Sequence, residues 1–277
     1  MQSHKSISKI IHSTDGTEIY YEVLGKEHKS PSLLFLHGLG GDLTAWNKER
    51  NALYALGHSS VAVDLRGHGL SGRPDKTDAY DLKIMSQDIE EVIRHEFKKP
   101  PIIVGHCFGG MISILLSAFK PHIARGLILV DTSYKPPYNS SFFIRIKTLH
   151  HLFHLIARYA PVLHIKGHIH FKNFKNTSDY DLRRVINDIA HVSLRTYLMT
   201  VDNILEYNSL YLLKRIRIPT LIIEGSQDTV FPAPIAQELH KRIITSELKL
   251  IKGANHIVVL NNPKDLVDAI FSFVLKV

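Results

Sequence analysis

The stretch from Ile102 to Leu116 constrains this fold more than any other part of the chain. It opens with a short apolar, β-branched run, which indicates a buried strand. The turn Gly105-His106-Cys107-Phe108-Gly109 follows, and the apolar residues after it predict a helix that packs against a sheet. Glycines two positions either side of Cys107 leave room for a tight turn and a strained backbone at the cysteine. The pattern therefore predicts a strand, a sharp turn that presents the Cys107 thiol, and a helix.

Further short apolar runs predict the rest of an α/β fold, a mostly parallel eight-stranded sheet with helices on both faces. Runs that are apolar at nearly every position are typical of parallel strands covered by helices on both sides. Besides the strand before Cys107, they cover residues 31–36, 60–65, 126–131, 218–225 and 248–251. Residues 7–12 and 17–24 flank Asp15-Gly16 and predict an antiparallel hairpin that opens the sheet. Helical periodicity runs from Asp78 to Phe97 and stops before two prolines.

Motifs follow the predicted strands in a fixed order. The glycine-rich loop 37–41 has the pattern H-G-x-G, and residues 64–71 have the pattern D-x-R-G-H-G-x-S. The segment G-S-Q-D ends at Asp228, and A-N-H ends at His256. Together with the turn around Cys107, this order resembles the α/β-hydrolase superfamily over nearly the whole predicted sheet region, with cysteine where serine is usual.

The resemblance implies a catalytic triad in the order nucleophile, acid, histidine. Cys107, Asp228 and His256 occur in that order, each just past a predicted parallel strand, where ligands and catalysts gather. His256 would take the thiol proton, and Asp228 would fix the imidazole tautomer and stabilise its charged form. Asp131 is the alternative acid, because some relatives place it after the preceding strand. We expect a standing thiolate–imidazolium pair.

A second group of residues is expected to bind the reacting carbonyl. The resemblance makes His37 and Gly38 part of the oxyanion loop, whose glycines let the backbone approach a ligand closely. The backbone N–H groups of Leu39 and Phe108 are expected to hold the developing oxyanion. Trp46 follows on a short helical segment, and we expect it either at the mouth of the pocket or in the core.

Strand–helix alternation stops at residue 134 and resumes near residue 215. Between them, aromatic and basic residues mix in helical stretches at 142–146, 150–156, 181–189 and 194–205. By position this insertion is similar to the superfamily's helical cap, so we expect a cap at 134–215 and a core domain formed by 1–133 and 216–277.

The insertion holds seven histidines, but the sequence has no H-E-x-x-H, and we expect no metal site. In the core, the resemblance gives Arg66 and His68 a structural role.

The charge balance is basic, with 34 Lys and Arg against 26 Asp and Glu. These basic residues alternate with apolar ones instead of forming long blocks, so we expect a solvated surface and no nucleic-acid partner. The first residues lack the apolar core of a signal peptide and no run is long enough to span a bilayer, so we expect no stable membrane insertion. A single cysteine fits a reducing cytoplasm. No G-x-G-x-x-G opens a helix after the first strand, which predicts that no nucleotide cofactor is used.

Cysteine at the turn bears on the substrate. In a tetrahedral intermediate a thiolate leaves more readily than an alkoxide, so a plain alkyl ester tends to revert unless His256 protonates its alkoxide promptly. The sequence predicts a hydrolase for a small-molecule carboxylic ester or thioester, acting through an acyl-Cys107 intermediate. Acyl transfer to another acceptor and ligand binding with weak catalysis are the alternatives. A serine-to-cysteine replacement would give the same motif.

Overall fold

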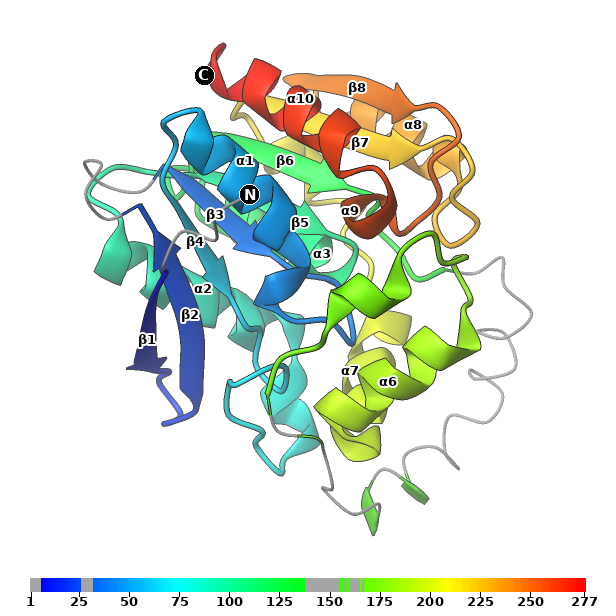
Figure 1. The fold of residues 1–277 in the computed structure, drawn as a ribbon. Helices are drawn as coiled ribbons and strands as arrows, with labels where there is room; N and C mark the ends of the chain where they lie inside the picture. The colour runs from blue at the N-terminus through cyan, green and yellow to red at the C-terminus, as the bar shows by residue number, and fades with distance from the viewer. Residues whose placement is uncertain (1–5, 26–31, 138–154, 157, 160–164, 166) are drawn as a thin grey trace.

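The computed structural model describes residues 6–25, 32–137, 155–156, 158–159, 165 and 167–277. In this part of the chain, eight strands form one sheet in the order β1-β2-β4-β3-β5-β6-β7-β8 (Figure 1). The strands are β1 (Ile7–His12), β2 (Glu18–Leu24), β3 (Leu33–Leu36), β4 (Ser60–Val63), β5 (Ile102–His106), β6 (Gly126–Val130), β7 (Thr220–Gly225) and β8 (Ser246–Ile251). The pairs β1–β2 and β2–β4 are antiparallel, and the other five pairs of neighbouring strands described here are parallel. The predicted hairpin and the predicted mostly parallel sheet are both confirmed.

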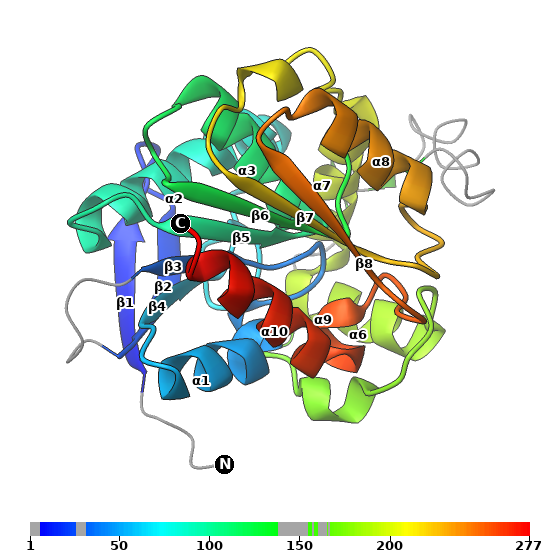
Figure 2. The same cartoon turned by 90° about the horizontal axis from the view of Figure 1, so that it is seen from above.

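Helices cover both faces of the sheet. Figure 2 shows α1, α9 and α10 on one face and α2, α3 and α8 on the other. These helices are α1 (Asn47–Ala55), α2 (Leu82–Glu96), α3 (Phe108–Phe119), α8 (Ala233–Arg242), α9 (Val258–Asn261) and α10 (Pro263–Val274). The three-layer arrangement is the one predicted from the alternation of apolar runs and helical periodicity.

Among the described residues, two large hydrophobic clusters form the core around the sheet, one on each face. Along β3, Leu34 and Leu36 pack in the cluster with α2 and α3, whereas Leu33 and Phe35 pack in the cluster with α1 and α10. All four side chains are fully buried. Because successive side chains of a strand point to opposite faces, a strand covered on both sides must be apolar at every position. This is the physical origin of the apolar runs in the sequence.

The predicted start of the helix at Asp78 is wrong. Residues Thr77–Tyr80 form a 3₁₀ turn, and α2 begins only at Leu82. The carboxylate of Asp81 accepts a hydrogen bond from the backbone N–H of Lys83 at 2.7 Å. Aspartate at this position satisfies a free N–H of the first helical turn, so the cap at Asp81 sets the start of the helix.

Arg66 and His68 have the structural role that the sequence predicted. The fully buried Arg66 guanidinium donates two hydrogen bonds to the Asp88 carboxylate on α2, at 2.8 Å each, and also pairs with Asp15 in the β1–β2 turn. The ring of His68 bonds to the carbonyl of Arg66 at 3.0 Å and packs against the ring of His37. Through Asp15 and Asp88, Arg66 joins the first hairpin to α2.

The described part of the chain between β6 and β7, called the insert below, lies beyond the carboxyl ends of the parallel strands (Figures 1 and 2). Its described elements are a 3₁₀ turn (Phe171–Phe174), α6 (Leu182–Val192), α7 (Leu194–Glu206) and a second 3₁₀ turn (Leu213–Arg215). The helices predicted at 181–189 and 194–205 are therefore present. The stretch 142–146 and most of 150–156 lie outside the described residues. Among the residues that are described, no helix combines the length and apolarity that crossing a membrane requires.

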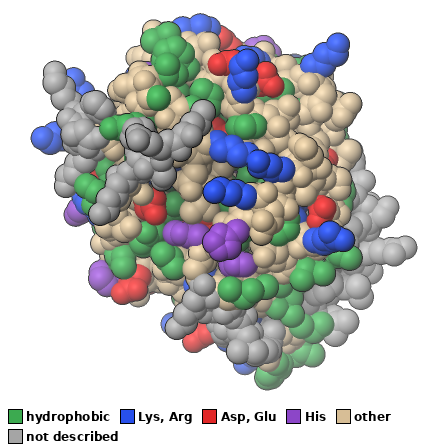
Figure 3. All heavy atoms as spheres, in the orientation of Figure 1, with side chains coloured by type: hydrophobic (Ala, Val, Ile, Leu, Met, Phe, Trp, Pro, Cys, Tyr) green, Lys and Arg blue, Asp and Glu red, His purple; other side chains and the backbone are tan. Residues whose placement is uncertain are grey.

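The surface on the side of Figure 1 is mixed in charge. Lysine and arginine side chains lie there in small groups, with acidic side chains among them and histidines near the middle of the view (Figure 3). This distribution agrees with the sequence, in which basic residues alternate with other types.

Candidate active site

Cys107 occupies the turn between β5 and α3, directly before the first residue of the helix. Its backbone has φ 50° and ψ −113°, in the left-handed half of conformational space that residues other than glycine rarely adopt. The strain is held by neighbours: the Cys107 N–H donates to the Val130 carbonyl at 3.0 Å, and its own carbonyl accepts from the Thr132 hydroxyl at 2.6 Å. Strain of this kind persists where the surrounding structure fixes it, and it commonly marks a functional site.

The glycines on either side of Cys107 are required by close backbone contacts. A Cβ atom on Gly105 would lie 2.6 Å from the carbonyl oxygen of Gly109. A Cβ on Gly109 would lie 2.6 Å from the carbonyl oxygen of Leu36, in the neighbouring strand. Any side chain at these positions would push the helix away from the sheet and move the thiol.

His256 and Asp228 meet at this turn from the loops that follow β8 and β7. The His256 Nδ1–H donates to the Asp228 Oδ2 at 2.8 Å, and both residues are buried. The second Asp228 oxygen accepts from the backbone N–H groups of Val230 and Phe231, at 2.7 and 2.8 Å. The carboxylate is therefore fixed by three donors, and the ring nitrogen that remains, Nε2, is available for the thiol.

The electrostatics of these groups favour a charged imidazole. Burial lowers the pKa of His256, but the charges of Asp228 and Cys107, and hydrogen bonds to both, raise it well above its ordinary value. Burial alone would raise the pKa of Asp228. The charge and hydrogen bond of His256, together with the two backbone donors, outweigh burial, so the pKa of Asp228 lies below its usual range. The predicted grouping of Cys107, Asp228 and His256 is thus present in space, across the ends of three parallel strands.

Asp131, the alternative acid, does not bond to the histidine. Its Oδ1 accepts the backbone N–H of Gly225 at 2.8 Å, and its Oδ2 is buried with no hydrogen-bond partner among the residues that the structure describes. It forms a group of three buried carboxyls with Glu224 and Asp228, whose oxygens lie within 4.8 Å of one another. Burial, followed by the charges of its two acidic neighbours, raises the pKa of Glu224 far above that of a free glutamate. Burial also raises the pKa of Asp131 well above its ordinary value, so protonation within this group reduces the repulsion between its carboxyls, and Asp228 is already committed to His256.

The H-G-x-G loop lies against the nucleophile. A Cβ on Gly38 would be 3.2 Å from the Cβ of Cys107, and the N–H of Gly109 donates to the His37 carbonyl at 3.1 Å. The His37 ring is buried and accepts the Leu65 N–H at its Nε2, at 3.0 Å, so its Nδ1–H donates to the Gly38 carbonyl at 2.8 Å. The His37 ring thus fixes the backbone of the H-G-x-G loop through these two hydrogen bonds.

Two residues of the expected carbonyl-binding group adjoin this loop. Leu39 continues the loop and is partly buried against the core, and Phe108 is the first residue of α3 and is fully buried. Trp46 is fully buried and packs against Phe35, with ring centroids 5.1 Å apart, so it takes the second of its two expected places, the core. Substrate contacts of these residues remain predictions.

His106 has a supporting role that was not predicted from the sequence. Its Nε2–H donates to the backbone carbonyl of His256 at 2.9 Å, and its ring packs on that of His256. Burial, then the charge of His256, lowers the pKa of His106 to about 3, so the ring is neutral. His106 occupies the variable position directly before the nucleophile in the motif. This position could have suggested its role, because the residue before Cys107 must lie at the same edge of the sheet.

Two residues of the insert were missed as well. Asp179 accepts hydrogen bonds from the loops of His256 and Asp228. His168, one of the seven histidines of the insertion, bonds through its Nε2 to the Asp64 carboxylate of the core at 2.8 Å. Neither lies in a motif, and their partners are at least 50 residues away along the chain, so no local signal could have found them.

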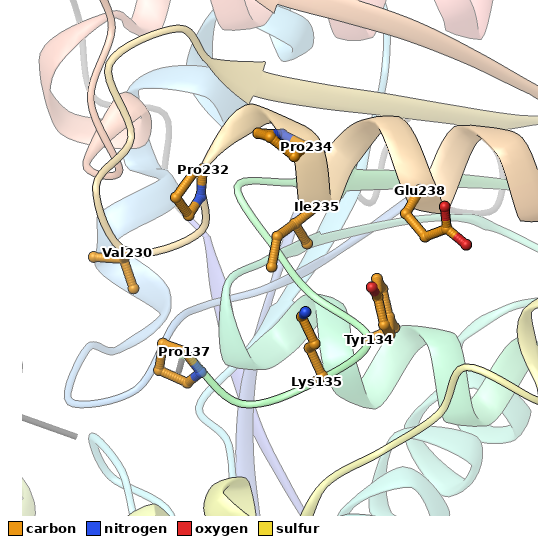
Figure 4. Close-up of a pocket in the computed structure, with 8 residues that line it drawn as sticks. All are labelled: Tyr134, Lys135, Pro137, Val230, Pro232, Pro234, Ile235 and Glu238. Atoms are coloured by element: carbon orange, nitrogen blue, oxygen red, sulfur yellow. The ribbon is translucent and has the colours of Figure 1, made fainter. Parts of the chain in front are cut away.

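A pocket of about 300 Å³ lies beside the acid loop. Figure 4 shows Tyr134 and Lys135 on one side of it and Ile235 and Glu238 of α8 on the other. Val230, which donates to the Asp228 carboxylate, forms part of its wall.

Comparison with known proteins agrees with this architecture. The model of the family described as alpha/beta hydrolase fold matches residues 31–263. Protein ABHD8 of Homo sapiens is 26% identical over 254 residues, a match that covers 88% of this chain and 55% of that protein. The chain thus spans about half the length of that relative.

Two other proteins are similar over more of their length. The sn-1-specific diacylglycerol lipase ABHD11 of Mus musculus is 26% identical over 275 residues, covering 91% of this chain and 84% of that protein. Among solved structures, the thioesterase domain from the curacin biosynthetic pathway superposes with a TM-score of 0.73 at 20% identity, covering 97% of this chain and 99% of that domain. The family match spans most of the sheet and every strand that carries a candidate catalytic residue, from β5 to β8. The chain therefore belongs to the alpha/beta hydrolase fold family.

Proposed function

We propose that this chain hydrolyses carboxylic esters or thioesters of small molecules through an acyl-Cys107 intermediate. The observation that carries the proposal is the pairing of Asp228 with the His256 imidazole at 2.8 Å, next to a thiol held on a strained turn. The membership of the family and the similarity to a diacylglycerol lipase support hydrolysis of an ester bond. We also propose that residues 134–215 act as a cap over the site, because Asp179 and His168 join them to the core.

The proposed reaction follows from the geometry. The Cys107 thiolate attacks the acyl carbon, and the N–H groups of Leu39 and Phe108 stabilise the negative charge that develops on the carbonyl oxygen. The His256 imidazolium donates its proton to the departing alkoxide or thiolate as the bond to the acyl carbon breaks. Water then attacks the acyl-enzyme, His256 takes the water proton, and the acid product leaves with the thiolate restored. Asp228 stabilises the positive charge of the imidazolium in both halves.

The nucleophile makes a thioester, or an ester with a good leaving group, the preferred substrate. When both leaving groups of the tetrahedral intermediate are sulfur, expulsion of the substrate thiolate competes evenly with return of the enzyme thiolate. With an alkyl ester, return of the Cys107 thiolate is favoured unless His256 protonates the alkoxide first. We therefore expect thioesters and aryl esters to be cleaved faster than alkyl esters of the same acyl group.

Intact-protein mass spectrometry tests this proposal. The protein is mixed with p-nitrophenyl esters and acyl thioesters of graded chain length, while released product is followed in parallel. We expect steady release of acid and a transient acyl adduct that is absent in Cys107→Ala. The Cys107→Ala and His256→Ala variants should each lose roughly 10³-fold or more in kcat/KM. Turnover that survives Cys107→Ala would refute the assignment of the nucleophile.

Acyl transfer is the second candidate, and the thiol favours it. A thioester intermediate keeps a high acyl-transfer potential, so an amine, alcohol or thiol acceptor that enters the site can compete with water. A stable adduct with a single burst of product, followed by turnover only when an acceptor is added, would identify a transferase. Free acid as the sole product across many acceptors would exclude it.

A further inference from the structure

The segment 176–179 of the insert lies across the loop that carries His256. The carbonyl of Thr177 accepts hydrogen bonds from the side-chain amides of Asn255 and Asn261, at 2.9 and 3.1 Å. The Asn261 side chain returns a hydrogen bond to the segment by accepting the Asn176 N–H at 2.8 Å. These contacts attach the insert to both sides of His256.

Asp179 ends this segment and contacts both loops of the triad. Its Oδ1 accepts the backbone N–H of His256 at 2.8 Å. Its Oδ2 accepts the backbone N–H and the hydroxyl of Thr229, at 2.9 and 2.5 Å, in the residue directly after Asp228. The side chain is buried at 8% exposure, and the Arg184 guanidinium donates to the Asp179 carbonyl at 2.7 Å, which fixes the backbone. One carboxylate therefore bridges the loop of the base and the loop of the acid.

We propose that Asp179 is a positioning residue for catalysis, holding the His256 and Asp228 loops at the separation at which their side chains pair. The inference rests on the proposed Cys107–His256–Asp228 triad. Since Asp179 comes from the insert, docking of the insert and assembly of the triad become one event.

The physical reason is the cost of leaving buried donors without an acceptor. Without the carboxylate, the N–H groups of His256 and Thr229 would lose their partner, and the two loops would move until water or another group replaced it. A displacement of about 1 Å in a catalytic group can cost roughly 10²-fold in rate. Hydrogen bonds to a charged acceptor are also stronger than those to a neutral one, so a neutral amide is a poor substitute.

The test compares two identical substitutions on nearby residues. Asp179→Asn removes the charge and one acceptor, since the amide nitrogen then faces an N–H. Asp181→Asn makes the same change two residues along, where the side chain caps α6 by accepting the Arg184 N–H at 2.9 Å. Asparagine caps helices nearly as well as aspartate, so this control removes the charge while keeping the local structure. A milder variant, Thr229→Val, removes only the hydroxyl hydrogen bond to Asp179.

The principal readout is alkylation of Cys107 by iodoacetamide between pH 5 and 9, which needs no ester substrate. Cys107 is the one cysteine in the sequence, so the rate reports on a single thiol. Iodoacetamide reacts with the thiolate form, and contact with the His256 imidazolium stabilises that form, so misplacing the pair makes the thiol less reactive at a given pH. We expect Asp179→Asn to move the alkylation profile to higher pH and to lower kcat/KM by roughly tenfold or more, mainly through kcat. Thr229→Val should move the alkylation profile in the same direction by less and lower kcat/KM by roughly threefold. Asp181→Asn should match the wild type in both measurements.

The outcomes separate the inference from the proposed function. If His256→Ala leaves the alkylation profile of the wild type unchanged, the triad itself is absent and both proposals fail. If His256→Ala changes the profile but Asp179→Asn and Thr229→Val do not, the triad stands and the role of Asp179 is refuted. A loss of activity in Asp179→Asn with an unshifted profile would mean that Asp179 only stabilises the fold, and it too would refute the inference.

Discussion

Replacing Glu224 by glutamine tests whether the buried carboxyl beside the triad carries a proton. Glu224 lies at the end of β7 and is fully buried beside the carboxyls of Asp131 and Asp228. Burial and the charges of Asp131 and Asp228 raise its pKa far above the ordinary 4.5. Between the unfolded and folded pKa values, the folded state therefore binds one proton more than the unfolded chain.

The sign and size of the effect follow from this proton. Because the folded pKa is the higher one, the stabilising contribution is complete below pH 4.5 and falls as pH rises toward the folded pKa. One proton corresponds to about 1.4 kcal/mol per pH unit. Between pH 6 and 8, the wild type should therefore lose about 3 kcal/mol of unfolding free energy through Glu224 alone. A glutamine side chain at position 224 does not titrate, and any cost of burying its amide is the same at every pH.

Urea unfolding of both proteins at pH 6, 7 and 8 measures this difference. We expect the free energy of unfolding of Glu224→Gln, minus that of the wild type, to rise by about 1.4 kcal/mol per pH unit at unchanged m-value. The same exchange at Glu247, an exposed glutamate on β8, is the matched control and should give parallel profiles. A difference that stays constant with pH at Glu224 would show that its carboxyl is charged in the folded protein, and the reasoning would be wrong.

Three further predictions concern the turn, the nucleophile and the insert. Gly109→Ala places a Cβ 2.6 Å from the Leu36 carbonyl oxygen, so it should lower the unfolding free energy by about 1–3 kcal/mol and slow Cys107 alkylation. If the variant has the thermal stability and the alkylation rate of the wild type, the steric argument is wrong. Cys107→Ser should raise the ratio of alkyl-ester to thioester turnover, measured as kcat/KM on a matched pair of substrates, because an alkoxide has no leaving-group advantage; an unchanged ratio would count against the proposed role of the thiolate. Burial lowers the pKa of His168, but the bond to Asp64 and its charge raise it overall, so this contact stabilises most below pH 6.5 and fades as pH rises through the raised pKa. His168→Gln should thus destabilise more at pH 6 than at pH 8 in urea unfolding, and equal losses at both would refute the charged contact.

The amino-acid sequence by itself determined the sheet and the nucleophile turn, because their causes are local. A strand covered on both faces must be apolar throughout, so Leu33–Leu36 and its neighbours are visible as runs. Close backbone contacts around the turn require glycine at positions 105 and 109, and the Asp15-Gly16 turn sets the first hairpin. The start of α2 was misplaced, although its cause, the cap at Asp81, is also local.

Only the tertiary structure decided which side chains meet at the site. Asp131 and Asp228 both follow parallel strands, so their sequence positions are equivalent, and the choice depends on which carboxylate lies in line with His256 Nδ1. Nothing in the sequence around Glu224 distinguishes it from other strand residues, because its pKa depends on two carboxyls that only the fold packs against it. Asp179 meets His256 across 77 residues of chain, a separation that no pattern of spacing or periodicity encodes. Such contacts arise from how the insert packs on the sheet, and packing is a property of the whole fold.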